Sequence, residues 1–302
     1  AAASAAGGLG CIGAGSTLDG EELRAEIRSV RAQTDRPFAV DILFATVAAK
    51  VNEAVRYTDK VAAMVDVVME ERVPVLISGL GSPKGVVARA KEQGMVVMSV
   101  IGAVRHAQKA VADGVDAVIA SGSDGGGHVG SIGTAALIPA VVDAVDVPVL
   151  AGGGLADGRG LVAALSFGAQ GVWMGTRFIA TQEARAHENY KQKIAETDTA
   201  GTIVTRAHSG KTCRLIRNGF TDSWASREAE IEPYPLQGMH VGHPASQRGR
   251  IEGDVENGVL PAGQSSGLID DVPSAGDVVR TVMAEAKLVL SKLTADTVLA
   301  AE

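Results

Sequence analysis

Seven short runs of apolar and β-branched residues recur along the chain, and most of them end in Gly, Ser or Asp. They span residues 9–15, 37–43, 73–79, 95–102, 117–122, 147–152 and 171–175. The runs are continuously apolar rather than alternating, which is typical of strands buried on both faces of a parallel sheet. Successive runs start roughly 20 to 36 residues apart, which is the length of one βα unit.

Segments with helical periodicity separate these runs, at residues 20–33, 53–71, 83–93, 104–113, 134–145 and 158–167. Asp19 and Glu22 have the spacing of a capping box, which predicts that the first of these helices begins there. Seven βα units predict an α/β fold, a (β/α)8 TIM barrel that lacks its first strand in this sequence. A doubly wound open sheet is the alternative, but nothing in the sequence marks a reversal of strand order.

The two ends of the chain differ from this repeating unit. Residues 1–8 look like the end of a helix that closes on glycine, so we expect the natural polypeptide to begin further upstream. After Thr176 the repeat stops, and a long stretch rich in Gly, Pro and polar residues precedes a final helical pattern. We therefore predict three parts, which are a (β/α) barrel over 1–181, a helical and irregular lid segment over 182–272 that covers the barrel mouth, and a closing helix over 273–302 packed on the barrel.

Composition narrows the function classes. Hydrophobic residues make up 46% and charged residues 21%, which is enough to bury a large core. A net charge of −7, with 3% aromatic residues and no basic run, argues against nucleic-acid binding. No apolar stretch is long enough to predict a membrane-spanning helix. Cys11 and Cys213 are the only cysteines and lie far apart in sequence, which favours a reducing cytoplasm over a disulfide scaffold. Cys11 lies within an apolar run, so we expect it in the core.

Glycines gather where the last strands end, in residues 121–130 (SGSDGGGHVG), 152–158 (GGGLADG) and 175–178 (GTRF). In a barrel of this kind the active site lies at the carboxyl ends of the strands, and phosphate sites use the last loops. Backbone N–H groups of glycine turns can approach phosphate oxygens closely because no Cβ intervenes. These loops predict a phosphate cradle, and the alternative is that the glycines only make tight turns.

His128, which follows three glycines, is the main candidate for a catalytic group, because an imidazole can act as a general base near neutral pH. The alternative is an ordinary loop histidine. His240 and His243 have a His-x-x-His spacing without further ligands nearby, so no metal site is predicted. Asp41, at the end of the second run, either accepts a hydrogen bond from a ligand ring or caps the following loop.

Taken together, these motifs resemble those of the nitronate monooxygenase family, formerly called 2-nitropropane dioxygenases, which are FMN-dependent (β/α)8-barrel enzymes. The matching stretches cover nearly the whole chain in order, and they are residues 7–10 (GGLG), 125–130 (GGGHVG), 151–159 (AGGGLADGR), 171–178 (GVWMGTRF) and 261–264 (PAGQ). This chain differs from the family at two positions. It has Asp41 where the family often has Asn, and Trp173 where relatives often have a polar residue. The first strand of the family, which supplies flavin contacts, is not in the sequence.

The resemblance implies that His128 is the catalytic base and that the glycine turns hold the FMN phosphate. The residues expected to bind the cofactor are Asp41, Gly122, Gly127, Gly152, Gly153, Gly154, Gly175, Thr176 and Gln264.

The implied reaction is the oxidation of an alkyl nitronate or nitroalkane by FMN and O₂ to a carbonyl compound and nitrite. An NAD(P)H-dependent flavin reductase of an enoyl thioester or quinone is the alternative on the same scaffold. A degenerate flavin-binding barrel without turnover is a further alternative. We expect small-molecule substrates, no nucleic-acid or membrane partner, and a cytoplasmic enzyme; the oligomeric state stays open.

Overall fold

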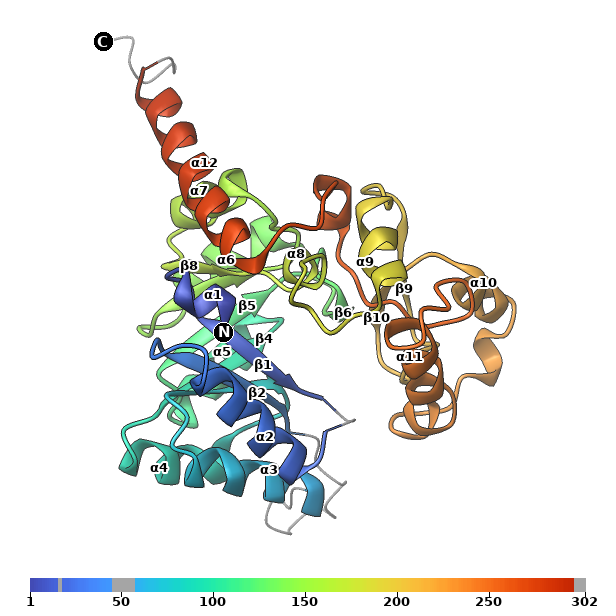
Figure 1. The fold of residues 1–302 in the computed structure, drawn as a ribbon, viewed down its shortest axis with the longest axis horizontal. Coiled ribbons are helices and arrows are strands. Elements are labelled where there is room, and N and C mark those ends of the chain that lie inside the picture. Colours follow the sequence, from blue (N-terminus) through green and yellow to red (C-terminus); the bar gives the residue numbers. More distant parts are fainter. Residues whose placement is uncertain (16–17, 45–57, 296–302) are drawn as a thin grey trace. The chain divides into compact units, whose positions relative to one another are not determined.

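The computed structural model describes residues 1–15, 18–44 and 58–295 of the chain (Figure 1). By its internal contacts the chain divides into two compact units. Unit 1 comprises Ala1–Ala120 and Ala140–Leu150, and unit 2 comprises Ser121–Pro139 and Ala151–Glu302. Each unit is described by itself below.

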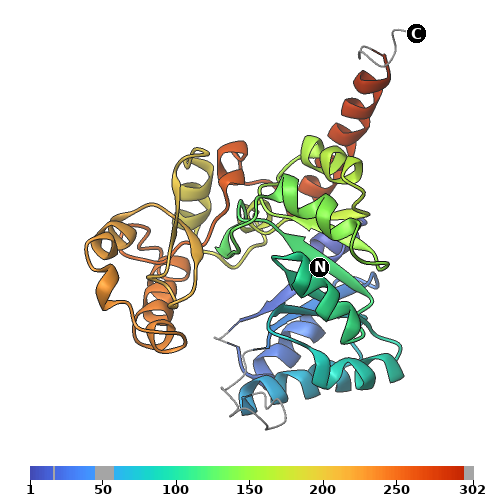
Figure 2. The same cartoon turned by 180° about the vertical axis from the view of Figure 1, so that it is seen from behind.

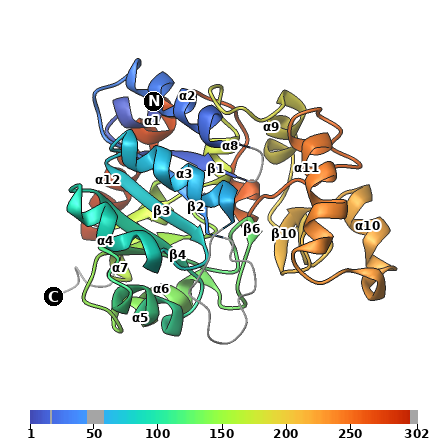
Figure 3. The same cartoon turned by 90° about the horizontal axis from the view of Figure 1, so that it is seen from below.

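Unit 1 is built on five strands in sequence order, each hydrogen-bonded in parallel to the next. The strands are β1 (Gly10–Ala14), β2 (Phe38–Leu43), β3 (Val75–Leu80), β4 (Val96–Ile101) and β5 (Ala117–Ser121), and the helices are α1 (Ala2–Ala5), α2 (Gly20–Arg31), α3 (Asp59–Glu70), α4 (Lys84–Glu92) and α5 (Val104–Ala112). Figures 1 and 3 show α2, α3 and α4 on the same side of strands β1–β4. The sheet therefore has one face covered by amphipathic helices.

The elements of unit 1 form where the residue pattern places them. Val40, Leu76 and Ile77 in the central strands are completely buried, as continuous apolar runs require. At the start of α2 the Asp19 carboxylate accepts from the Glu22 N–H at 2.9 Å, and Glu22 accepts from the Asp19 N–H at 2.8 Å. The predicted capping box is thus confirmed.

The chain crosses between the units within α6 (Thr134–Val142) and β7 (Val149–Gly152). In strand order the large sheet reads β1-β2-β3-β4-β5-β7-β8, so each of the seven predicted strands is found. The remaining strands and α-helices belong to unit 2, which also has short 3-10 or π helices at Glu228–Glu230, Gly238–Gly242 and Gln264–Leu268. These strands and α-helices are β6 (Gly127–His128), α7 (Gly158–Ser166), β8 (Gly171–Trp173), α8 (Thr176–Ile179), α9 (Glu188–Ala195), β9 (Thr202–Thr205), β10 (Cys213–Ile216), α10 (Gly219–Ala225), α11 (His243–Arg250) and α12 (Ala275–Ala295).

Unit 2 contains a second, smaller sheet that the sequence pattern did not predict. Its strand order is β6-β10-β9, and all pairs are antiparallel. β9 and β10 form a hairpin within the segment expected to be helical and irregular. β6, the end of the glycine loop after β5, pairs with β10 through His128 opposite Cys213. The small sheet thereby ties the glycine loop to residues some 80 positions later in the chain.

The last helix, α12, packs along α7 within unit 2, as Figures 1 and 2 show from opposite sides. Leu161 and Val162 of α7 are buried against Val278 and Val282 of α12. Gly158 lies at the closest approach of the two helices, because a Cβ there would lie 2.4 Å or less from atoms of α12. The apolar stripe of the closing helix thus finds its partner in α7.

Cys11 is exposed, which differs from the expectation that it lies in the core. The strand that carries it, β1, is first in the strand order and pairs with β2 alone. Its residues therefore alternate between exposed and partly covered positions until Ala14, which is buried.

Candidate active site

The glycine loop after β5 is fixed by its own backbone and by Asp124. The Gly122 N–H donates to the Gly152 carbonyl at 3.0 Å, and the Gly125 N–H donates to the Gly122 carbonyl at 3.1 Å. A Cβ at Gly122 would collide with Thr134, so no larger residue fits there. The Asp124 carboxylate accepts from the Thr134 N–H at 2.8 Å, which joins the loop to the start of α6.

Gly153 and Gly154 form the turn after β7, and both have positive φ angles, of 96° and 73°. Only glycine adopts this conformation without strain. A Cβ on Gly153 would also lie 2.9 Å from the Gly122 carbonyl oxygen and from Thr134 Oγ1. The Thr134 hydroxyl donates to the Gly153 carbonyl at 3.0 Å, which holds the turn against the glycine loop.

Gly175 and Thr176 begin α8, and they differ from the other glycine positions. A Cβ on Gly175 would meet no described atom within 4 Å, and its φ of −94° is ordinary. Thr176 is buried, and its Oγ1 accepts from the Gly263 N–H at 3.0 Å. The α8 start is therefore linked to the 261–264 motif, with open space beside Gly175.

Gln264 joins the same constellation through its backbone, since its N–H donates to the Asp124 carbonyl at 2.9 Å. The neighbouring residues pack still closer, because a Cβ on Gly126 would lie 2.7 Å from the Gly263 nitrogen. The structure thus brings three sequence-distant motifs into contact in unit 2, which are the 121–128 loop, the 152–154 turn and the 261–264 segment.

His128 ends the glycine loop as an exposed residue of β6, and its side chain contacts the β9–β10 turn. Its Nε2 lies 2.7 Å from the hydroxyl of Ser209, which belongs to the β9–β10 turn. The ring of His208 is tilted against it, with the centroids 5.8 Å apart. Desolvation, and then the positive charge of Lys211, lower the pKa of His128 from its ordinary value. A neutral imidazole at pH 7 is the form that can accept a proton.

Asp41 lies near the carboxyl end of β2 and belongs to unit 1, whereas the residues described above belong to unit 2. Its Oδ1 is buried and has no hydrogen-bond partner within the described residues. Burial raises the pKa of this carboxyl to about 7, although a hydrogen bond from the Gly79 backbone opposes the rise. The loop after β2 lies outside the described residues, so both roles expected of Asp41 stay predictions.

Several residues of the constellation were not singled out from the sequence. Asp124, Thr134 and Gly263 hold the glycine turns together, and Ser209 and Lys211 lie beside His128. Gly210 indicates a tight turn in the sequence, but nothing in residues 209–211 (SGK) connects this turn with His128. Contacts over such a sequence distance have no local signature.

The residues present fit the phosphate of a flavin mononucleotide. The N–H groups of Gly153, Gly154 and Gly175 donate to no acceptor within the described part of the chain. Positive φ angles at the first two and the open Cβ position at the third leave room for phosphate oxygens close to the backbone. These residues, with Thr176, form the donor set that would hold the phosphate.

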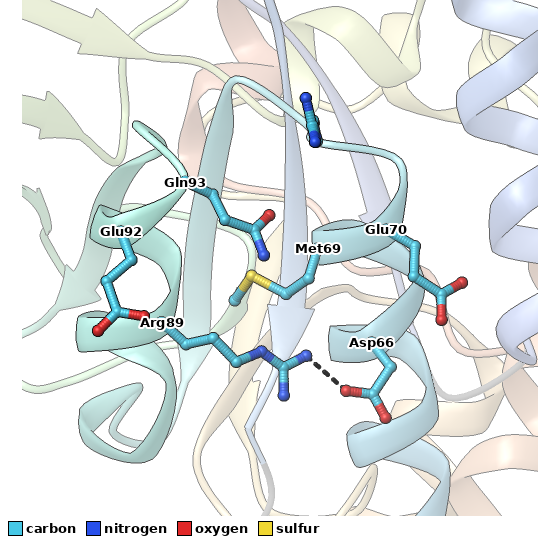
Figure 4. A pocket seen from close by; sticks show the side chains of 7 residues that line it. Asp66, Met69, Glu70, Arg89, Glu92 and Gln93 are labelled. Carbon is cyan, nitrogen blue, oxygen red and sulfur yellow. Dashed lines mark hydrogen bonds and ion pairs between the residues drawn. The ribbon is translucent and has the colours of Figure 1, made fainter.

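A surface pocket of about 680 Å³ lies elsewhere, between α3 and α4 of unit 1 (Figure 4). Its lining is polar and charged, and Arg89 forms an ion pair with Asp66 across it. It contains none of the predicted site residues, and it has neither a glycine turn nor a histidine. The residues that line it are Asp66, Met69, Glu70, Arg72, Arg89, Glu92 and Gln93.

The model of the nitronate monooxygenase family matches residues 1–285. The chain belongs to the nitronate monooxygenase family. A probable nitronate monooxygenase of Staphylococcus haemolyticus is 35% identical, over 76% of this chain and 74% of that protein. A hydroxy-methyl-oxo-octahydroindene-carboxyl-CoA dehydrogenase of Mycobacterium tuberculosis is 34% identical, over 93% of this chain and 86% of that protein.

Two solved structures extend the comparison. FabK of Thermotoga maritima has a TM-score of 0.87 and 36% identity, and the match covers 97% of this chain and 89% of that one. A nitroalkane oxidase of Streptomyces ansochromogenes has a TM-score of 0.86 and 28% identity, with 97% and 92% covered. The likeness confirms the predicted α/β barrel fold of parallel strands. As a member of this family, the protein is a flavin-dependent oxidoreductase that acts on small molecules.

Two further observations concern the described residues alone. Among residues 1–15, 18–44 and 58–295, no helix is long and apolar enough to cross a membrane. The same residues include no group of three or more His, Cys, Asp or Glu side chains that could hold a metal ion.

Proposed function

We propose that the protein is an FMN-dependent nitronate monooxygenase that converts alkyl nitronates, with O₂, to carbonyl compounds and nitrite. The observation that carries the proposal is the placement of His128 in the loop that packs on the glycine turn. A Cβ on Gly125 of this loop would lie 3.4 Å from the Gly153 Cα, so the imidazole and the phosphate donors share one backbone scaffold.

His128 has the attributes of the base. Its pKa is lowered, so the imidazole is neutral near pH 7. Its Nδ1 makes no hydrogen bond within the described residues, whereas Nε2 is engaged by Ser209. For a neutral nitroalkane, Nδ1 takes the α-proton and leaves the nitronate. For a preformed nitronate, the same nitrogen has no proton to remove, and the ring only orients the anion.

When bound, a flavin would supply the redox chemistry that moves electrons from the nitronate to O₂. The N–H groups of Gly153, Gly154 and Gly175 would hold its phosphate. A Cβ at Gly122 would collide with Thr134, whereas a Cβ at Gly127 would meet nothing within 4 Å and one at Gly152 would make ordinary contacts at 3.6 Å. Thr176 and Gln264 border the same space. The cofactor contact expected of Asp41, which belongs to unit 1, stays a prediction from the sequence.

Comparing two protonation states of one substrate tests the base role. His128→Ala is expected to lower turnover of a neutral nitroalkane by roughly 10²–10⁴-fold, the usual contribution of a positioned general base. Turnover of the preformed nitronate should fall much less. His106→Ala, on the exposed face of α5, is the matched control and should leave both rates unchanged. Equal losses for both substrate forms would contradict base catalysis, and no loss for either would remove His128 from the site.

A second candidate function is supported by the names of two relatives. The CoA dehydrogenase of Mycobacterium tuberculosis and FabK of Thermotoga maritima are as similar to this chain as the nitronate monooxygenase is. An NAD(P)H-dependent reductase of an enoyl thioester would use the same cradle and the same histidine. The two functions differ in what reduces the flavin, which anaerobic mixing with each reductant separates.

A further inference from the structure

Nε2 of His128 is hydrogen-bonded to the hydroxyl of Ser209. Ser209 lies outside the family motifs, and the sequence pattern did not single it out. The Ser209 Oγ lies 2.7 Å from Nε2, which is a short and well-formed hydrogen bond. Ser209 is only 4% exposed, so water does not compete freely for its hydroxyl. Ser209 follows His128 by 81 positions, and the contact depends entirely on tertiary structure.

The backbone fixes both partners of this hydrogen bond to the same small sheet. His128 lies in β6, opposite Cys213 of β10. One residue further on, the Val129 N–H donates to the Thr212 carbonyl at 3.2 Å, and the Thr212 hydroxyl donates to the Val129 carbonyl at 2.8 Å. The distance from His128 to the β9–β10 turn is therefore set by paired strands rather than by a free loop.

The turn that carries Ser209 is itself rigid. The Gly210 N–H donates to the Arg206 carbonyl at 2.8 Å, and the φ of 82° at Gly210 requires glycine. Buried Gln237 donates from its Nε2 to the Ala207 carbonyl at 2.7 Å and accepts from the Glu232 N–H at 3.0 Å. Such tethering on both sides of Ser209 is the arrangement that supports a precisely placed functional group.

A hydroxyl beside a neutral imidazole decides which ring nitrogen carries the proton. If the hydroxyl donates to Nε2, then Nδ1 holds the hydrogen and neither nitrogen is free to act as a base. If Nε2–H donates to the hydroxyl, Nδ1 keeps its lone pair. Ser209 Oγ also accepts from the Lys211 N–H at 3.4 Å, so the protein already uses it as an acceptor.

We propose that Ser209 is a positioning residue that accepts a hydrogen bond from Nε2–H of His128 and so keeps Nδ1 as the proton-accepting atom. The inference rests on the base role proposed above. During abstraction the α C–H bond of the nitroalkane breaks, its electron pair forms the C=N bond of the nitronate, and the proton goes to Nδ1. Ser209 accepts from the same Nε2–H before and after, more strongly from the imidazolium.

The tautomer of His128 is the direct test, and it needs no turnover. In full-length protein labelled with ¹⁵N-histidine, two-bond ¹H–¹⁵N spectra report which nitrogen is protonated, and His128→Gln identifies the signal. We expect wild-type His128 to be protonated on Nε2 at pH 8, with or without flavin. The opposite tautomer in the wild-type protein would overturn the proposal without any change to Ser209.

Three variants separate positioning from packing. Ser209→Ala should give a mixture of tautomers and lower nitroalkane turnover by roughly tenfold to a hundredfold, the effect of losing a hydrogen bond to a charged group. It should leave nitronate turnover nearly unchanged. Ser209→Thr, which retains the hydroxyl, should restore the Nε2–H tautomer and most of the activity. Thr212→Val removes a hydroxyl contact between the same two segments without touching the ring, and it should preserve the tautomer.

The outcomes also distinguish this inference from the proposed function. A wild-type tautomer and rate in Ser209→Ala would overturn the positioning role while leaving His128 as the base. Equal losses in Ser209→Ala and Thr212→Val would mean that the loop, not the hydroxyl, matters. If the protein does not oxidise nitroalkanes at all, the proposed function fails, yet the tautomer measurement still decides what Ser209 does to His128.

Discussion

The positive charge of Lys211 acts on the pKa of His128, which makes the pH dependence of the site testable. Its Nζ lies 4.0 Å above the ring of Tyr234, which holds the ammonium at one place in the β9–β10 turn. After desolvation, this positive charge is the second cause of the lowered pKa of His128. The base form exists above that pKa, so nitroalkane activity is lost as the pH falls through it.

Lys211→Met should therefore raise the pKa of His128, because a charge that disfavours the imidazolium is removed. The acid limb of the nitroalkane pH–rate profile should move to higher pH by roughly half a unit. Lys287→Met, on the exposed side of α12, should leave the profile in place. A shift to lower pH in Lys211→Met, or the same shift in both variants, would contradict the assignment.

Asp41 makes folding stability depend on pH in unit 1. Burial raises the pKa of its carboxyl to about 7, far above the value in an unfolded chain. The folded protein then binds one proton more than the unfolded chain between about pH 4 and pH 7, so this residue lowers stability as the pH rises through that range. Above pH 7 the full cost of an ionised, partly unpartnered carboxylate remains.

Asp41→Asn should stabilise the flavin-free protein at pH 8 by roughly 1–3 kcal/mol, since a neutral amide carries no such cost. The gain should disappear at about pH 3, where the wild-type carboxyl is protonated in both the folded and the unfolded protein. Urea unfolding at the two pH values measures the difference, with exposed Asp35→Asn as the control. A stabilisation that is equal at both pH values would show that charge is not the cause.

Gly175 and Gly153 both belong to the proposed phosphate cradle, but only one of them can be substituted without damage to the fold. Gly153 has a positive φ and neighbours within 3.0 Å of a Cβ, so Gly153→Ala damages the fold itself. Gly175 has neither constraint. Gly175→Val should leave the melting temperature of the flavin-free protein nearly unchanged but weaken FMN binding at least tenfold, because the side chain enters the phosphate space. Unchanged FMN affinity in Gly175→Val, measured by fluorescence titration, would place the phosphate elsewhere.

At the scale of elements, the contact of α12 with α7 depends on one glycine. The Gly158 N–H donates to the Glu285 carboxylate at 2.9 Å, and a Cβ at Gly158 would overlap the backbone of Ala286. Gly158→Ala should therefore lower the free energy of unfolding by roughly 1–3 kcal/mol, the usual cost of overpacking.

The control for this prediction is Gly133→Ala, because a Cβ at Gly133 meets nothing within 4 Å and the φ is ordinary. Thermal denaturation of both variants is the measurement. Equal melting temperatures for Gly158→Ala and the wild type would show that α12 does not pack where the structure has it.

The elements of unit 1 were predictable because each has a local cause. Val40 and Leu76 lie in continuous apolar runs that only a doubly covered strand accommodates, and Asp19 starts a helix with its own side chain. The glycine turn at Gly153 was recognisable for the same reason, since its backbone requires that residue type. The domain boundaries at residues 181 and 272 stay a prediction.

The β9–β10 hairpin and its contact with β6 were not predictable in this way. The two strands are short: Cys213–Ile216 pairs with Gly127 and His128 on one side and with Thr202–Thr205 on the other. Nothing in the residues around Ser209 indicates a histidine 81 positions away. The sequence therefore indicated the candidate base, but the group that sets its tautomer became visible only in the structure.

At the scale of the whole molecule, the proposed function is that of a nitronate monooxygenase rather than of a reductase driven by a nicotinamide. Both functions use a flavin and a base, so neither the fold nor the glycine motifs separate them. The difference lies in the electron donor. For a monooxygenase the nitronate itself is the electron donor, whereas an enoyl reductase needs NADH or NADPH as the donor.

Anaerobic stopped-flow mixing of the FMN-loaded protein with an alkyl nitronate, and separately with NADH and NADPH, tests this claim most directly. We expect rapid loss of the oxidised flavin absorbance with the nitronate, and no comparable bleaching with either nicotinamide. Rapid bleaching by NADH or NADPH, with a flavin that nitronate leaves oxidised, would contradict it and assign the protein to the reductases.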